Sequence, residues 1–315
     1  MRLNVGVTDF DWYSHLATAR DFDEVNFWSP GGASFKVLKP GELFLFKLKA
    51  AHNHVVVGGG IFAHDTLLPL SLAWGAFGQK NGVANLEEMQ ARIRRYLSAG
   101  AREVRDPVIG CRLLQQPFFF APDQWFRVPD SFPVNAVSGK SYRLDEAEGA
   151  WLYRAVEERL SYRLPSGEPT VPGVGEVGRT GKPQIALPRL GQGTFRIAVT
   201  DHYERRCAVT EEKTLPLLDA AHIKPWNEGG EHRPDNGILL RTDVHRLFDL
   251  GYVTISHDHR FEVSPKLVED YGNGRHYYAL HGQPIRPPTN SSLLPSKEAL
   301  DWHHANRWTR PGFTG

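Results

Sequence analysis

The chain has 315 residues, of which 41% are hydrophobic and 23% charged, and its formal net charge is +1. This length and composition predict a globular protein of two domains, and the near-neutral charge argues against a large cationic surface. No stretch approaches the ~18 apolar residues of a membrane span, and no signal-peptide core follows Met1, so we expect a cytoplasmic protein with no membrane partner. Cys111 and Cys207 allow neither a disulfide framework nor a Cys₄ zinc site, and we expect both to be buried.

The first 133 residues alternate short apolar runs with turn signals. The elements predicted in chain order are a strand at 5–9, a helix at 11–18, strands at 24–28, 43–48 and 54–62, a helix at 86–97 and strands at 107–114 and 125–129. Leu86, Met89, Ile93 and Leu97 form the apolar stripe of the clearest helix. Many short strands with few helices favour a small closed barrel.

Two features of this region invite a ligand-binding interpretation. The triplet Gly58 to Gly60 lacks the Gly-Lys-Ser/Thr of a phosphate loop, and a bend in a curved strand explains it better. Phe27 and Trp28 precede a Pro-Gly-Gly turn, and Trp74 falls in a segment that we interpret as a Gly-rich loop. Aromatic rings in such places can stack on a flat ligand in a pocket, although burial in the core explains them equally well.

The order of these segments resembles an EVE domain, which is a PUA-like β-barrel. The resemblance covers about the first 130 residues and is carried by N-F-W-S-P-G-G, K-P-G-E-L-F-L-F-K, V-V-V-G-G-G-I-F, A-W-G-A-F-G and P-F-F-F-A-P-D-Q-W-F. It implies a pocket for a flipped, modified base, for which Trp28, Trp74 and Phe27 are the candidate residues.

A bridging segment follows the first domain. Residues 145–160 are predicted to be a helix, and residues 163–192 hold five Pro and six Gly, the composition of a flexible linker. We therefore expect a modified-base reader at 1–140, a bridging helix and linker at 141–192 and a second domain at 193–315.

The second domain holds the polar residues whose spacing points to catalysis. A short apolar strand at 215–223 is followed by a Gly- and Pro-rich loop at 227–236, a strand at 237–240 and a helix from Thr242 or Asp243 to about residue 250, where Gly251 ends it. The side chains of residues four apart on this helix lie on one face, with Cβ atoms about 5–6 Å apart.

Four side chains carry this prediction. His245 and Asp249 on one helical face can share a divalent metal ion. His222 ends the strand that faces this helix, and its imidazole could take a proton from a water molecule that attacks phosphorus. Asn236 ends the loop, where its amide can bond backbone groups and fix the loop.

This segment resembles the HNH endonucleases, whose active site is a ββα-metal unit. The resemblance is carried by D-A-A-H-I-K-P-W, D-N-G-I-L-L and D-V-H-R-L-F-D-L-G. It implies that His222 is the general base, that Asn236 holds the loop, and that His245 and Asp249 bind the metal. Many members carry a further ligand directly before the first histidine. Here that position is Ala221, and Asp219, on the same side of the strand, can take its place.

EVE domains fused to HNH nucleases occur as modification-dependent restriction endonucleases, and this pairing resembles that family. The fold class implied is α+β, with an N-terminal PUA-like barrel and a C-terminal HNH ββα-metal domain. The implied substrate is double-stranded DNA with 5-methylcytosine or a related modified cytosine, and the implied cofactor is one Mg²⁺ or Mn²⁺ per active site. One such site cuts one strand, so a homodimer is expected. An inert PUA-like reader and a nuclease indifferent to modification are the alternatives.

The remaining candidates lie outside these motifs. A helix predicted at 193–203 brings Arg196, Arg205 and Arg206 near the site. These arginines, with Lys224, are candidate DNA phosphate contacts, and a solvated face explains the arginines equally well. Residues 251–264 predict a hairpin that turns at residue 258, and 300–308 predicts a final helix. Its histidines lack the strand and loop that the motif requires, so they are not expected to be catalytic.

Overall fold

The computed structural model describes residues 1–19, 22–32, 34–136, 138–161 and 190–308. The chain divides into two compact units, Met1–Pro188 and Arg189–Gly315, and each is described by itself. Within the described ranges, no helix is long and apolar enough to cross a membrane. Most of the linker predicted at 163–192 lies outside the described residues.

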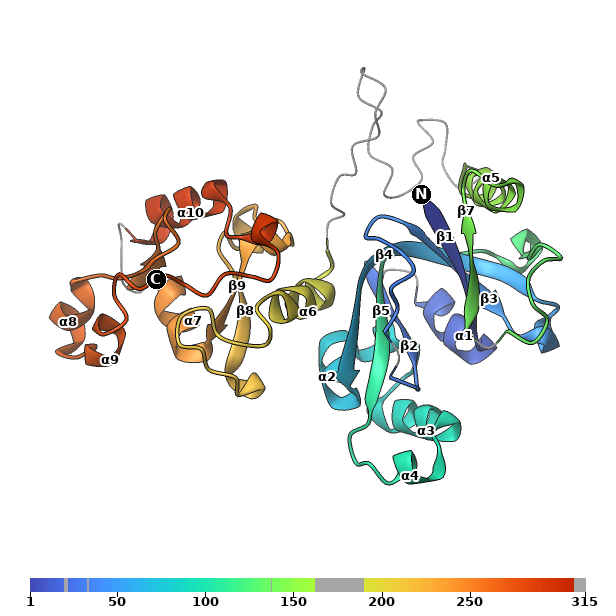
Figure 1. Cartoon of the computed structure of the whole chain (residues 1–315), viewed down its shortest axis with the longest axis horizontal. Helices are drawn as coiled ribbons and strands as arrows, with labels where there is room; N and C mark the ends of the chain where they lie inside the picture. Colours follow the sequence, from blue (N-terminus) through green and yellow to red (C-terminus); the bar gives the residue numbers. More distant parts are fainter. Residues whose placement is uncertain (20–21, 33, 137, 162–189, 309–315) are drawn as a thin grey trace, which may run out of the picture. The chain divides into compact units, whose positions relative to one another are not determined.

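The first unit is built on one mixed sheet (Figure 1). Its strands run in the order β2-β5-β4-β3-β1-β7, and β6 pairs with β4. The pairing of β1 with β3 is parallel, whereas the other strand pairs are antiparallel. The elements are β1 (Arg2–Thr8), α1 (Phe10–Thr18), β2 (Glu24–Ser29), β3 (Leu43–Leu48), β4 (Val55–Pro69), α2 (Leu70–Phe77), α3 (Leu86–Tyr96), α4 (Ala99–Arg102), β5 (Val108–Phe119), β6 (Phe126–Arg127), β7 (Gly139–Arg143) and α5 (Ala147–Ser161).

The sequence L-F-L-F in β3 shows why this sheet is buried on both faces. Successive side chains of a strand point to opposite faces. Leu43 and Leu45 therefore join the core that α5 covers, whereas Phe44 and Phe46 join the core that α1 covers. The strand reads as a continuous apolar run because neither of its faces meets water.

The expected closed barrel is not found in the described residues. The sheet is open, with β2 and β7 at its two ends. The helices α1 and α5 supply apolar cover on the two faces, so the sheet buries both without closing on itself. The coarser α+β class is confirmed.

Two local predictions in this unit have different outcomes. The glycine triplet lies inside β4, where register shifts at 59–61 bend the strand, and a Cβ at Gly59 would approach the carbonyl oxygen of Phe44 within 2.7 Å. This agrees with a bend rather than a phosphate loop. The prediction that Trp74 lies on a loop is wrong, because α2 spans it and ends before Gly78, which has a positive φ of 46°.

The second unit contains a strand-loop-strand-helix segment followed by a hairpin and short helices. The elements are α6 (Gln192–His202), β8 (Leu218–His222), β9 (Gly237–Arg241), α7 (Thr242–Asp249), β10 (Val253–Ile255), β11 (Phe261–Val263), α8 (Lys266–Tyr271), α9 (Arg275–Tyr278) and α10 (Lys297–His303). The strands β8 and β9 are antiparallel, as are β10 and β11. The predicted order of elements and the hairpin at 251–264 are confirmed.

Two boundaries in this unit differ from the prediction. The strand expected from residue 215 begins at Leu218, because 215–217 form a 3₁₀ turn around Pro216, and proline cannot donate to a strand ladder. The last helix is α10, which continues as a π-helical turn at His304–Trp308. His303 is buried, with Nε2 2.9 Å from the carbonyl oxygen of Phe248, so its role is packing.

Candidate active site

The two strands and the helix place the predicted catalytic residues around one cavity. His222 is the last residue of β8 and lies opposite Gly237 in the β8–β9 register. On α7, Val244 and Phe248 are buried against the strands, and the next stripe of the helix carries His245. The cavity is about 590 Å³ and is lined by Gln192, Phe195, Arg196, Asp219, Ala220, His222, Pro225, Trp226, His245, Asp249 and Arg307.

Gly237 brings α6 close enough to shape the surroundings of His222. A Cβ at this glycine would lie 2.5 Å from Cγ2 of Val199 and 2.8 Å from Cζ of Phe195, so a larger residue would displace the helix. The Phe195 ring stacks on the His222 imidazole with a centroid separation of 3.9 Å and an interplanar angle of 12°. One face of the imidazole is therefore shielded from water.

This shielding sets the protonation state of His222. Burial, followed by the nearby His232 and His245, lowers the pKa of His222 from 6.5 to about 4. The imidazole is therefore neutral at physiological pH and has a lone pair with which to accept a proton.

His245 lies between the two carboxylates that were expected to share a metal with it. Its Nδ1 is 3.3 Å from Oδ2 of Asp219, and its Nε2 is 3.5 Å from Oδ2 of Asp249. Burial raises the pKa of Asp249, and the positive charges near it oppose the shift. The structure thus brings together the three side chains predicted to bind a metal, with one carboxylate facing each ring nitrogen.

The donor set suits a hard divalent cation, although the donors do not converge on one point. Among the described residues, no three or more His, Cys, Asp or Glu side chains are grouped so that they could hold a metal ion together. Carboxylate oxygens and one imidazole nitrogen nevertheless have the chemistry that Mg²⁺ or Mn²⁺ takes from proteins. His245 Nε2 and Asp249 Oδ2 lie 3.5 Å apart.

Asn236 holds the two ends of the loop between the strands. It is 7% exposed, and its Oδ1 accepts the N–H of Lys224 at 2.9 Å. Its Nδ2 donates to the carbonyl oxygens of Lys224 and Glu231, both at 2.9 Å. The side chain thereby satisfies three backbone groups that the loop would otherwise leave unpaired.

A further histidine in this loop was missed by the sequence analysis. His232 Nδ1 lies 2.8 Å from His222 Nε2, and Trp226 stacks on the His232 ring at 4.4 Å with an interplanar angle of 4°. The signal available in the sequence was a second histidine ten residues after the first, within the loop that Asn236 ends.

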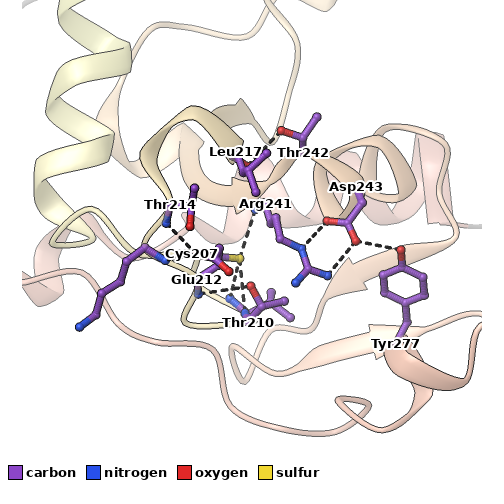
Figure 2. Close-up of polar contacts among 11 residues, drawn as sticks. Cys207, Thr210, Glu212, Thr214, Leu217, Arg241, Thr242, Asp243 and Tyr277 are labelled. Atoms are coloured by element: carbon purple, nitrogen blue, oxygen red, sulfur yellow. Dashed lines mark hydrogen bonds and ion pairs between the residues drawn. The ribbon is translucent and has the colours of Figure 1, made fainter. Parts of the chain in front are cut away.

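A polar network fixes the direction in which α7 leaves β9 (Figure 2). Arg241 forms a two-bond ion pair with Asp243 at 2.6 and 2.8 Å, and the Tyr277 hydroxyl donates to Asp243 at 2.9 Å. The Thr242 hydroxyl donates to the carbonyl oxygen of Leu217, and the buried Cys207 Sγ accepts the backbone N–H of Arg241 at 3.2 Å. These contacts hold the first turn of α7, one turn before His245.

The candidate phosphate-binding residues are only partly brought together. Arg196 lines the cavity beside His222. Arg205 and Arg206 do not line it and pair with Asp201 and Glu211, so they are not at the site as described. Lys224 does not line it and instead lines a separate small hollow together with Asn236. Arg307 was not predicted, and it lines the main cavity and pairs with Glu228 at 2.6 Å.

The first unit has a cavity of its own, of about 730 Å³. Phe27 and Trp28 line it, whereas Trp74 on α2 does not. Phe27 is 5% exposed and packs against Trp12 edge to face at 5.2 Å. The indole N–H of Trp28 donates to the carbonyl oxygen of Asn81 at 2.9 Å, which fixes the ring at the cavity wall.

A buried lysine also lines this cavity. Lys47 is 1% exposed, its Nζ donates to the carbonyl oxygen of Leu48 at 3.0 Å, and it lies 4.9 Å from the centroid of the Phe132 ring. Burial lowers its pKa. In the described part of the chain no carboxylate pairs with it, so the cavity wall carries a buried amine beside the Phe132 ring.

One comparison with known proteins, a family model, covers the site in the second unit. Residues 207–256 match a family model described as HNH endonuclease. No curated protein matches the chain. A solved structure titled "Modification dependent TagI restriction endonuclease" is similar at 13% sequence identity, with a TM-score of 0.28 over 94% of this chain and 79% of that one.

Proposed function

The second unit carries an HNH endonuclease domain, and from that premise we propose that the protein is a modification-dependent DNA endonuclease. The second unit hydrolyses phosphodiester bonds. The first unit, as an EVE-type PUA-like domain, reads a flipped modified cytosine such as 5-methylcytosine. The reader is proposed at 1–140 and the nuclease at 193–315. The segment expected as a bridge at 141–192 begins with the end of β7, which pairs with β1, and with α5, which covers the first unit's sheet, so these two elements belong to the reader.

The hydrolytic half of the proposal rests chiefly on the state and position of His222. It is neutral at physiological pH because burial lowers its pKa, and it opens on the same cavity as His245 and Asp249. A water molecule in that cavity could lose a proton to the imidazole as its oxygen attacks phosphorus. Arg196, in the same cavity, would bind the phosphate.

His245 and Asp249 are the residues that would hold Mg²⁺ or Mn²⁺. Such an ion supplies positive charge against the phosphate oxygen and the leaving 3′ oxygen. Asp219 faces the other nitrogen of His245 at 3.3 Å, so in this geometry it orients the imidazole through Nδ1. Asn236 keeps the loop between β8 and β9 in place through its bonds to the backbone of Lys224 and Glu231.

The reading half of the proposal rests on the cavity of the first unit. Its volume of about 730 Å³ accommodates a nucleobase, and Phe27 and Trp28 give it aromatic walls on which a base can stack. Lys47 offers buried N–H donors to the acceptor atoms of a pyrimidine edge. Trp74 does not line this cavity, so we propose no stacking role for it.

One site of this kind cuts one strand, so two copies of the chain are proposed to act together on a double-stranded site. Light scattering would measure the oligomeric state. A strictly monomeric protein that makes efficient double-strand breaks would contradict the homodimer.

Digestion of cytosine-methylated and unmethylated copies of one plasmid, side by side with Mg²⁺ or Mn²⁺, tests the whole proposal. We expect cleavage of the methylated plasmid, much slower cleavage of the unmethylated one, and none after chelation of the metal. Equal cleavage of both would identify a nuclease indifferent to modification. Binding of methylated DNA without cleavage under any metal would identify an inert reader.

A further inference from the structure

The hydrogen bond between His222 and His232 constrains how the first histidine can act. Nε2 of His222 and Nδ1 of His232 lie 2.8 Å apart, so the two nitrogens share one hydrogen. If His232 donated it, the Nε2 lone pair of a neutral His222 would be occupied and Nδ1 would carry the proton. If His222 donates it, Nδ1 is left with a free lone pair.

The surroundings hold both rings in place for this contact. Phe195 stacks on His222 at 3.9 Å, and Trp226 stacks on His232 at 4.4 Å. Two hydrogen bonds also fix the backbone at His232. Asn236 Nδ2 donates to the carbonyl oxygen of Glu231, and the carbonyl oxygen of His232 accepts the N–H of Leu190 at 3.2 Å. Neither ring can turn without breaking a stack.

We propose that His232 is a positioning residue that accepts the Nε2–H of His222 and thereby reserves Nδ1 of His222 for the attacking water. The inference rests on the hydrolytic function proposed above. His232 does not touch the substrate. It acts on the reaction by fixing the tautomer and the orientation of the base.

The atoms and protons that move in the proposed hydrolysis all belong to His222, the phosphodiester and water. The water oxygen bonds to phosphorus, its proton moves to Nδ1 of His222, and the bond from phosphorus to the 3′ oxygen breaks. The 3′ oxygen takes a proton from solvent water. His222 is then an imidazolium with a proton on each nitrogen, still donating Nε2–H to His232, and it later releases the Nδ1 proton to solvent.

As the acceptor for the Nε2–H of His222, an imidazole affects the pKa of the base differently from a carboxylate. A carboxylate partner would stabilise the imidazolium and raise the pKa of the base, whereas an imidazole that accepts through Nδ1 orients the base without adding negative charge. The other charged or titratable groups that line the cavity around His222 come from each neighbouring element. They are Arg196 on α6, Asp219 on β8, His245 and Asp249 on α7 and Arg307 after α10.

The test compares three substitutions at this position in the full chain. His232→Phe keeps a ring against Trp226 and removes the acceptor, and we expect a loss of about 10²-fold in the cleavage rate with little change in KM. His232→Asn restores an acceptor and should recover at least about ten-fold over the Phe variant. His232→Asp should cleave but move the acidic limb of the pH–rate profile to higher pH.

A second readout does not depend on cleavage. Nitrogen-15 NMR of the metal-free protein at pH 7 should find His222 protonated at Nε2, and in His232→Phe this preference should weaken. Protonation of His222 at Nδ1 in the unaltered protein would overturn the inference, as would full activity of the Phe variant. If the unaltered protein cuts no DNA, the hydrolytic function itself fails, and the NMR result still decides the tautomer.

Discussion

Replacement of Asn236 by Ala should loosen the loop that carries His232. The side chain makes three hydrogen bonds to the backbone of Lys224 and Glu231 and is 7% exposed. Each such bond contributes about 0.5–1.5 kcal/mol, and buried partners left unpaired add to the loss, so we expect a decrease of about 2–4 kcal/mol in the free energy of local opening. The two backbone hydrogen bonds of residue 236 survive the substitution.

Hydrogen exchange measured by mass spectrometry on peptides within 218–241 reports this opening directly, because amide exchange follows the local opening of each segment. Asn290→Ala is the matched control, since Asn290 is exposed and its side chain accepts from the backbone N–H and the hydroxyl of Ser292, within its own turn. We expect fast exchange in the first variant and near-normal exchange in the second. Equal protection of 218–241 in both variants would refute the reasoning that Asn236 holds the loop.

Three further predictions follow from single contacts. Gly237→Ala should lower the free energy of unfolding of the second unit by about 1–3 kcal/mol through overlap with Phe195, seen as a lower Tm of that unit; an unchanged Tm contradicts the close approach of α6. Burial lowers the pKa of His303 from 6.5 to about 4, so the unfolded chain takes up a proton that the folded chain does not. Stability should fall as the pH decreases from 6.5 towards 4, and His303→Gln should reduce that dependence in denaturant titrations; an unaltered dependence refutes it. Lys47→Met should weaken binding of methylated DNA by about ten-fold or more, while the exposed Lys39→Met should not; equal binding by both variants removes Lys47 from the reading pocket.

The strand-loop-strand-helix segment could be predicted from the sequence because its signals are local. Gly251 ends α7, Asn236 and the glycines mark the loop, and the four-residue spacing of His245 and Asp249 requires one helical face. The strand prediction overlooked Pro216, which lies in a 3₁₀ turn at 215–217, so β8 begins at Leu218 rather than at residue 215.

The errors arose where the outcome depended on distant parts of the chain. Closure of a sheet is decided by which strands form its ends and by the cover that α1 and α5 provide, which no single segment encodes. The glycines near Trp74 were interpreted as a loop, although they lie late in α2 or beyond its end. His232 was missed because its contact with His222 depends on how the loop folds back, and neither the strand nor the helix period predicts that contact.

Cleavage of supercoiled methylated plasmid by His222→Ala, measured beside the unaltered protein with Mn²⁺ or Mg²⁺, tests the central claim most directly. We expect the unaltered protein to cut the plasmid, and the variant to bind it equally well but to cut it at least about 10²-fold more slowly. A variant that cuts at the rate of the unaltered protein would show that His222 is not the base.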